Sequence, residues 1–137
     1  MQKRCSCGDV MPIKLRTVIY SHKVEIDNVP IYSCSACNRS EVFPDVKPDL
    51  TGLIGKLGAK PVKQTYFFNE WNEWANLLVE AYRERNRCDP VVVRRLTEDR
   101  INMLLDLHIV AESLQDEEWI ADIHKRLSQL SRTLLLN

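Results

Sequence analysis

Two short cysteine clusters, Cys5-Ser6-Cys7-Gly8 and Cys34-Ser35-Ala36-Cys37, decide how the first third of this chain folds. Four thiolates in two closely spaced pairs are the donor set of a tetrahedral structural zinc site. Each pair can present both sulfurs from one tight turn, and a hairpin between the pairs would bring the two turns together. The sequence therefore predicts a structural zinc ion bound by Cys5, Cys7, Cys34 and Cys37.

The first pair has one residue between its cysteines, where most zinc knuckles have two. Either the turn accommodates the shorter spacing, or one of these two sulfurs is not a ligand and His22 or Cys88 replaces it. His22 falls in a predicted strand region, which favours an exposed surface histidine, and Cys88 falls at a predicted helix end. With four cysteine ligands the zinc would keep no open position for water, which argues against hydrolysis at this metal.

The chain around these clusters has the pattern of short strands, rich in β-branched residues. Asp27-Asn28 has turn chemistry, and Pro30 places its strand at a sheet edge or begins it. A module of about 45 residues buries too little apolar surface to fold alone, and zinc binding of on the order of 10 kcal/mol would compensate. We expect a three- or four-stranded antiparallel sheet with both cysteine turns at one end. The predicted strands are residues 13–20, 24–26, 29–33 and 41–43.

From Thr65 onward the apolar residues recur at helical spacing. The first helix is expected to span about 20 residues and to end near Asn86 or Cys88, because Asp89-Pro90 discourages continuation. A second helix begins at Pro90, with a new N-cap expected at Thr97, and a third follows the acidic turn at residues 115–118. The last two helices should pack as an antiparallel hairpin. The apolar face of the first helix contains Phe67, Trp71, Trp74, Leu78 and Tyr82.

These patterns predict an α+β fold, in which a small zinc-ribbon-like antiparallel β module precedes a three-helix domain. The β module covers residues 1–46. A short helix capped by Asp49 and a linker over residues 58–65 make up residues 47–65. The helical domain covers residues 66–137.

Composition narrows the class of protein. Hydrophobic residues make up 45% and charged residues 28% of the 137 residues, as in ordinary globular proteins. No apolar run approaches the roughly 20 residues of a membrane span, and the N-terminus lacks the pattern of a signal peptide. We therefore expect a cytoplasmic protein without membrane contact, where clustered cysteines bind metals more often than they form disulfides.

The formal net charge is zero, but residues 1–65 carry ten Lys/Arg against six Asp/Glu and residues 66–137 carry nine against thirteen. The balanced total argues against phosphate-backbone binding as the main task of the chain. The asymmetry leaves room for a mildly basic first module. Its basic residues would contact phosphates in a nucleic-acid-binding protein: Lys3, Arg4, Lys14, Arg16, Lys23 and Arg39.

Residues 5–43 resemble the YgiT-type zinc finger, the N-terminal domain of MqsA-like antitoxins. The resemblance rests on Cys7-Gly8, on a strand pair, and on Val29-Pro30 shortly before Cys34-Ser35-Ala36-Cys37. It implies a structural zinc on Cys5, Cys7, Cys34 and Cys37, although the C-x-C of this chain departs from the C-x-x-C of the family. The helix-turn-helix of the antitoxins has no counterpart in residues 66–137, so their operator binding is not carried over. Residues 101–130 faintly resemble the IDEAL domain of bacterial proteins of the Firmicutes.

The leading hypothesis is a non-enzymatic zinc-binding regulator or adaptor that acts through protein–protein interaction. The aromatic helix around Trp71 and Trp74 would supply a docking or self-association surface, if its rings are not core residues. A nucleic-acid-binding transcriptional regulator is the alternative, and an enzyme of unknown type is the third hypothesis. His108 and His124 are expected to be structural or surface histidines, because the sequence contains no H-E-x-x-H motif.

Overall fold

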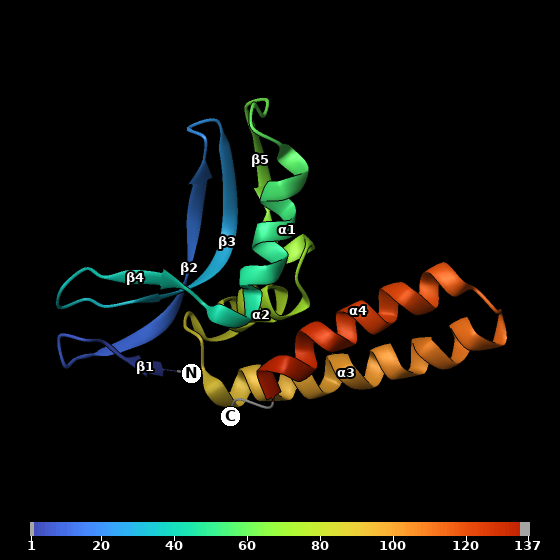
Figure 1. The fold of residues 1–137 in the computed structure, drawn as a ribbon. Coiled ribbons are helices and arrows are strands. Elements are labelled where there is room, and N and C mark those ends of the chain that lie inside the picture. The colour runs from blue at the N-terminus through green and yellow to red at the C-terminus, as the bar shows by residue number, and fades with distance from the viewer. Residues whose placement is uncertain (1, 135–137) are drawn as a thin grey trace.

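The longest strands of the protein are two neighbours, β2 (Val10–Tyr20) and β3 (Val24–Ser33), in a computed structural model that describes residues 2–134 and the side chains of residues 2–131. They form an antiparallel hairpin, with Ile13 opposite Tyr32 and Tyr20 opposite Val24. Side chains on one face of this hairpin, among them Val24 and Ile26, are fully buried. The hairpin is thus the frame on which the rest of the sheet is built (Figure 1).

Three short strands complete the sheet. β1 (Gln2–Arg4) pairs antiparallel with β2, and β4 (Ser40–Val42) pairs antiparallel with β3. β5 (Gln64–Phe67) also pairs with β3, but in parallel. The predicted antiparallel sheet is confirmed, but the predicted strands 24–26 and 29–33 form one continuous strand, β3. Neither β1 nor the parallel strand β5 is among the predicted strands. The residues 58–65 predicted as a linker therefore include the first two residues of β5.

The predicted turn at Asp27-Asn28 is wrong. The chain instead reverses between β2 and β3 through Ser21 and His22, whose φ angles are 55° and 58°. Asn28 lies inside β3 with a φ of 63°, where the register between β2 and β3 shifts. One residue of β2 there opposes two of β3, which is a β-bulge. The turn chemistry of Asp27-Asn28 accommodates the bulge instead of ending the strand.

Four α-helices follow the strand β4. They are α1 (Lys47–Leu57), α2 (Glu73–Arg85), α3 (Pro90–Ser113) and α4 (Glu117–Leu134), and single 3₁₀ turns occupy Pro44–Val46 and Phe68–Glu70. The α+β class is confirmed. The described residues contain four α-helices: α1 lies in the segment predicted as a short helix, and α2, α3 and α4 lie in the predicted helical domain. The predicted helical domain extends to residue 137, and residues 135–137 lie outside the described part.

The predicted aromatic helix begins too early. Residues 64–67 form β5, and α2 starts only at Glu73, after Asn72, whose side chain accepts the Ala75 N–H at 2.9 Å. Phe67 and Phe68 have helical spacing with the later aromatic residues, but Phe67 pairs in parallel with β3 and Phe68 begins the 3₁₀ turn that follows β5. Phe68 is fully buried beneath the sheet. Tertiary pairing overrides local periodicity here.

The predicted N-cap at Thr97 is also wrong, because α3 runs without interruption from Pro90 to Ser113. Thr97 is buried, and its hydroxyl donates to the Val93 carbonyl at 2.7 Å. This bond to the carbonyl four residues earlier gives the buried hydroxyl a partner inside the helix, as mid-helix threonines often have. The N-cap of α3 is Asp89, which accepts the Val91 N–H at 3.0 Å.

One hydrophobic core joins the sheet to the helices. Phe43 at the end of β4 stacks on Trp74 of α2, with ring centroids 4.5 Å apart and planes inclined by 22°. The same buried cluster extends from Ile13 in β2 to Leu130 in α4. α2 contacts β3, α3 and α4, and the far part of the α3–α4 hairpin projects away from this core (Figure 1).

Candidate metal centre

The first cysteine pair lies on the tight turn that joins β1 to β2. The Gly8 N–H donates to the Cys5 carbonyl at 2.9 Å, and the Cys5 N–H donates to the Asp9 carbonyl at 2.7 Å. Gly8 has a φ of 99°, a conformation that side-chain-bearing residues rarely adopt. This glycine therefore lets a C-x-C sequence close a turn that has only one residue between its cysteines.

The second pair lies on the turn between β3 and β4. The Cys34 N–H donates to the Arg39 carbonyl at 2.8 Å, and Asn38 has a φ of 59°. Asparagine tolerates this left-handed conformation better than most residues. Because β2 and β3 are paired and β1 and β4 flank them, both cysteine turns lie at the same end of the sheet, as the sequence predicts.

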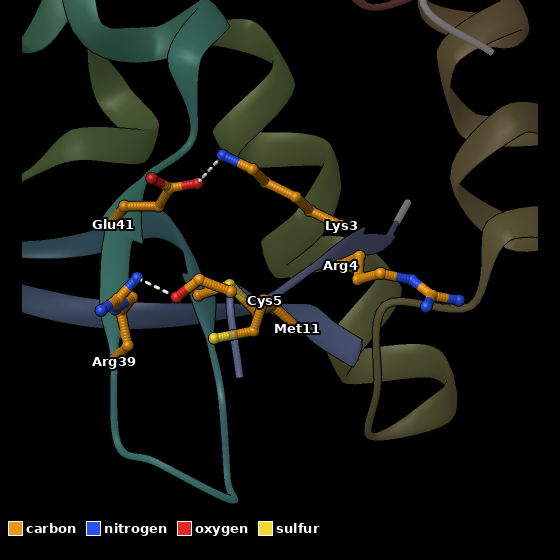
Figure 2. A pocket seen from close by; sticks show the side chains of 7 residues that line it. Lys3, Arg4, Cys5, Met11, Arg39 and Glu41 are labelled. Carbon is orange, nitrogen blue, oxygen red and sulfur yellow. Dashed lines mark hydrogen bonds and ion pairs between the residues drawn. The ribbon is translucent and has the colours of Figure 1, made fainter. Parts of the chain in front are cut away.

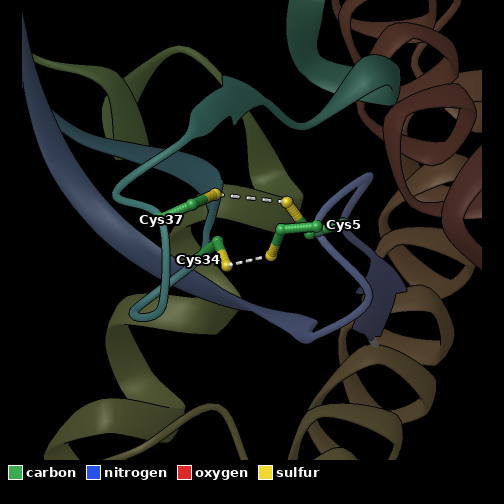
Figure 3. A group of neighbouring side chains, drawn as sticks. Cys5, Cys34 and Cys37 are labelled. Carbon is green, nitrogen blue, oxygen red and sulfur yellow. Dashed lines mark hydrogen bonds between the residues drawn. The ribbon is translucent and has the colours of Figure 1, made fainter.

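The four sulfurs converge (Figure 3). The Sγ atoms of Cys5 and Cys37 are 3.5 Å apart, and those of Cys7 and Cys34 are 3.6 Å apart. All four Sγ atoms lie within 4.8 Å of one another. A regular tetrahedron with zinc–sulfur bonds of about 2.3 Å has sulfur–sulfur edges of roughly 3.8 Å. The arrangement fits such an ion, and these four residues could hold a metal.

Each turn contributes one buried and one exposed cysteine. Cys5 and Cys34 are buried, with exposed fractions of 3% and 1%, whereas Cys7 and Cys37 are exposed. The buried pair packs with Met11 in a small apolar cluster that is separate from the main core. The site thus has a protein-covered inner side and a solvent-facing outer side, through which an ion can enter.

The protonation of these thiols depends on their turns. A hydrogen bond from the Cys7 backbone is the main cause that lowers the pKa of Cys5 to about 7. At Cys7 the backbone hydrogen bond at Asp9 lowers the pKa, but the neighbouring Cys5 and Cys34 thiols outweigh it and raise the pKa to about 12. The raised pKa of Cys7 means that its thiol resists ionisation beside the other sulfurs, and a cation bound among them would relieve this resistance.

The structure places His22 and Cys88 away from this cluster. His22 lies in the turn at the opposite end of the β2–β3 hairpin. Cys88 lies between α2 and α3, where burial raises the pKa of its thiol to about 11. Neither residue belongs to the group of converging ligand atoms, and the shorter C-x-C spacing brings both of its sulfurs into that group.

Basic side chains border a pocket next to the cysteine turns (Figure 2). Lys3, Arg4 and Arg39 line it together with Cys5 and Glu41. Lys3 forms an ion pair with Glu41 and lowers the pKa of that carboxyl group, and Arg39 donates to the Ser6 hydroxyl. Part of the predicted basic surface is therefore engaged within the protein.

The two tryptophans of the predicted docking surface have different positions. Trp74 is 3% exposed and belongs to the core. Trp71 precedes α2 and is half-buried, with the Lys56 ammonium 4.8 Å from its ring centroid. A docking surface that includes Trp74 is excluded, because the ring is covered by the protein itself.

The sequence analysis missed a contact between two histidines. His108 of α3 and His124 of α4 approach to 2.9 Å between their Nε2 atoms, and Glu112 lies four residues after His108. The spacing of His108 and Glu112 was visible in the sequence. The pairing with His124 depends on how α3 and α4 align, which the sequence pattern alone did not define.

Comparisons with family models, with curated proteins and with solved structures find no match to this chain. The resemblances to the YgiT-type zinc finger and to the IDEAL domain therefore stay predictions. Among the described helices, none combines the length and apolar character that a membrane span needs.

Proposed function

We propose that the four cysteines bind one structural zinc ion, and that the protein is a non-enzymatic cytoplasmic adaptor that docks a partner protein. Zinc is favoured because four sulfur donors in a closed tetrahedral set are its most common structural site. The two turns that it would join are separated by the whole β2–β3 hairpin in sequence. The ion would thus fix the end of the sheet and leave binding to other surfaces.

The observation that carries the adaptor proposal is an exposed apolar stripe on the projecting α3–α4 hairpin. Met103, Val110 and Leu114 of α3 are 52%, 46% and 66% exposed, and half-buried Leu107 lies between them. Spacings of four, three and four residues put these side chains on one helix face. An exposed stripe of this kind is what a helix of a partner protein covers in helix-in-groove recognition.

Charge specifies the chemistry of the partner. Residues 101–124 contain six Asp/Glu and no Lys or Arg. Most of the stripe therefore lies in an acidic stretch, and Arg100, whose guanidinium contacts the Met103 sulfur at 3.1 Å, is a basic side chain at its inner end. The occupant that complements this surface is an amphipathic helix whose apolar face is flanked by Lys or Arg.

The proposal is tested with paired variants. A triple Ser variant at Met103, Val110 and Leu114 removes the stripe. Its matched control replaces Ile19, Val62 and Val91 by Ser, which are 62%, 76% and 77% exposed and lie elsewhere on the surface. Proteins retained by the wild-type chain and by the control, but not by the stripe variant, are candidate partners.

The decisive step uses a synthetic helix from such a candidate. Titration with this basic amphipathic peptide should show binding that the stripe variant weakens at least tenfold and that the control preserves. Equal binding to both variants would contradict the adaptor proposal. A dimer that dissociates only in the stripe variant would identify a second copy as the occupant and would also contradict it.

Nucleic-acid binding is the second candidate, and the pocket lined by Lys3, Arg4 and Arg39 favours it. Titration of duplex DNA and of single-stranded RNA at low salt would show affinity that falls steeply as salt rises. Absence of binding at low salt removes this candidate. Binding that Arg4→Ala and Arg39→Ala weaken together would favour it over the adaptor.

A further inference from the structure

The α3–α4 hairpin brings two imidazole rings together at its surface. His108 and His124 stack with centroids 4.8 Å apart and planes inclined by 27°, and their Nε2 atoms are 2.9 Å apart. In a ligand-free protein one ring donates this hydrogen bond and the other accepts it. The two Nε2 atoms therefore face each other.

A carboxylate lies next to this pair. Glu112 Oε1 is 3.4 Å from His108 Nε2, and the Glu112 side chain is 61% exposed. Because Glu112 is one helical turn beyond His108, both extend from the same face of α3. The exposed carboxylate would turn towards a point that it shares with the two rings.

The spacing of these atoms suits a coordinated ion. Zinc–nitrogen bonds of about 2.0–2.1 Å with tetrahedral angles place two ligand nitrogens roughly 3.3–3.4 Å apart. The observed nitrogens need to separate by only a few tenths of an ångström. Imidazole and carboxylate donors suit Zn²⁺, Cu²⁺ and Ni²⁺ better than Mg²⁺ or Ca²⁺.

The electrostatic environment also favours a cation. The absence of Lys and Arg from residues 101–124 leaves six acidic side chains to set the local potential. Arg126, the nearest arginine along α4, is engaged by Asp122 and by Glu73, at 2.8 Å in each case. Lys125 follows His124 directly and is the one basic side chain adjacent to the pair in sequence.

We propose that His108, His124 and Glu112 form a second divalent-metal site, which clasps α3 to α4 and is chemically distinct from the cysteine cluster. Two nitrogens and one carboxylate leave a tetrahedral ion with one position for water. The ion would take the place of the hydrogen bond between the two Nε2 atoms, and each neutral ring would then carry its proton on Nδ1. It would join α4 to α3, the helix that carries the exposed apolar stripe, whereas the proposed cysteine-bound ion would join turns at the end of the sheet.

The test measures zinc per chain by equilibrium dialysis of the full-length protein against excess Zn²⁺ under reducing conditions. The wild-type chain should bind two ions, and His108→Ala and His124→Ala should each bind one. Glu112→Gln should lower the affinity for the second ion by about tenfold or more. His22→Ala is the matched control, because His22 lies in the β2–β3 turn, and it should keep both ions.

A second readout follows the imidazole nitrogens of all three histidines by NMR during the zinc titration. The second equivalent should shift the signals of His108 and His124 and leave those of His22 unchanged. One ion per wild-type chain, or a second ion that survives both alanine substitutions, would overturn the proposal. Cys34→Ser should lose only the ion at the cysteine cluster, and the histidine variants should lose only the second ion. Failure of one proposed site can therefore be told apart from failure of the other.

Discussion

Two regions of this protein join distant parts of the chain through buried polar groups, and they do so differently. At the cysteine end of the sheet, Cys5 and Cys34 are buried with little more than Met11 around them. At the junction of α2, α3 and α4, the buried Glu73 accepts from Arg100 and from Arg126, each at 2.8 Å, beside a large core. On our proposal an ion would hold the first region, whereas the second is held by packing and ion pairs.

The difference lies in what each region would lose. Without a bound cation, the cysteine turns keep four crowded thiols and only a small apolar cluster. Without the Glu73 ion pairs, the helices keep the shared core that runs from the sheet to α4. We therefore expect disruption of the cysteine end to be severe and dependent on metal, and disruption of the helix junction to be graded and independent of metal.

The largest effect is expected from Cys34→Ser, which removes a buried ligand. Because structural zinc binding contributes on the order of 10 kcal/mol, loss of the ion should unfold the cysteine end. Hydrogen exchange should show lost protection in β1 and both cysteine turns, while α3 and α4 stay protected. Cys88→Ser is the control and should retain one ion at the cysteine cluster. Full zinc binding by Cys34→Ser would contradict the claim that the cysteine end of the sheet depends on an ion bound by Cys34.

Trp74→Ala tests how much the hydrophobic core between the sheet and the helices contributes to stability. Deleting a buried tryptophan that stacks on Phe43 should lower the free energy of unfolding by about 3–5 kcal/mol. Urea denaturation, followed by a signal from the helices, measures the loss. The loss should be equal with and without metal at the cysteine cluster. Trp71→Ala, at a half-buried ring, should cost less. A larger loss from Trp71 than from Trp74 would show that the stack is not a main part of the core.

Glu73→Gln tests the ion pairs directly. The substitution leaves two arginines without their shared partner, and these are 29% and 40% exposed, so water compensates in part. We expect a loss of about 3 kcal/mol in the free energy of unfolding by urea denaturation. Glu84→Gln breaks an exposed pair with Arg95 and should cost at most about 1 kcal/mol. Equal losses in the two variants would show that burial of Glu73 adds nothing.

The same carboxylate gives the smallest effect, a dependence of stability on pH. Burial raises the pKa of Glu73, but hydrogen bonds from Arg100 and Arg126 outweigh burial and hold it below the ordinary 4.5. A pKa lowered by folding stabilises the protein above pH 4.5, and this stabilisation is lost as the pH falls through the folded-state value. Below pH 4.5 the wild-type chain should lose stability more steeply than Glu73→Gln. Parallel curves would contradict this account.

The sequence pattern predicted the features that depend on local chemistry. The cysteine pairs, the β-branched strands and the Asp89-Pro90 boundary each carry their signal in a few adjacent residues. It did not predict the parallel pairing of β5 with β3, because Phe67 and Phe68 also fit the periodicity of the following helix. The approach of His108 to His124 was missed for a related reason: it depends on how two helices align across their connecting turn.

The most direct test of the cysteine centre is X-ray absorption at the zinc edge, on the full-length chain loaded with one equivalent of zinc. If Cys5, Cys7, Cys34 and Cys37 all bind the ion, the spectrum should show four sulfur ligands at about 2.3 Å and no nitrogen or oxygen. Cys5→Ser should then show three sulfurs. A wild-type shell with fewer than four sulfurs, or with a histidine nitrogen, would contradict the account.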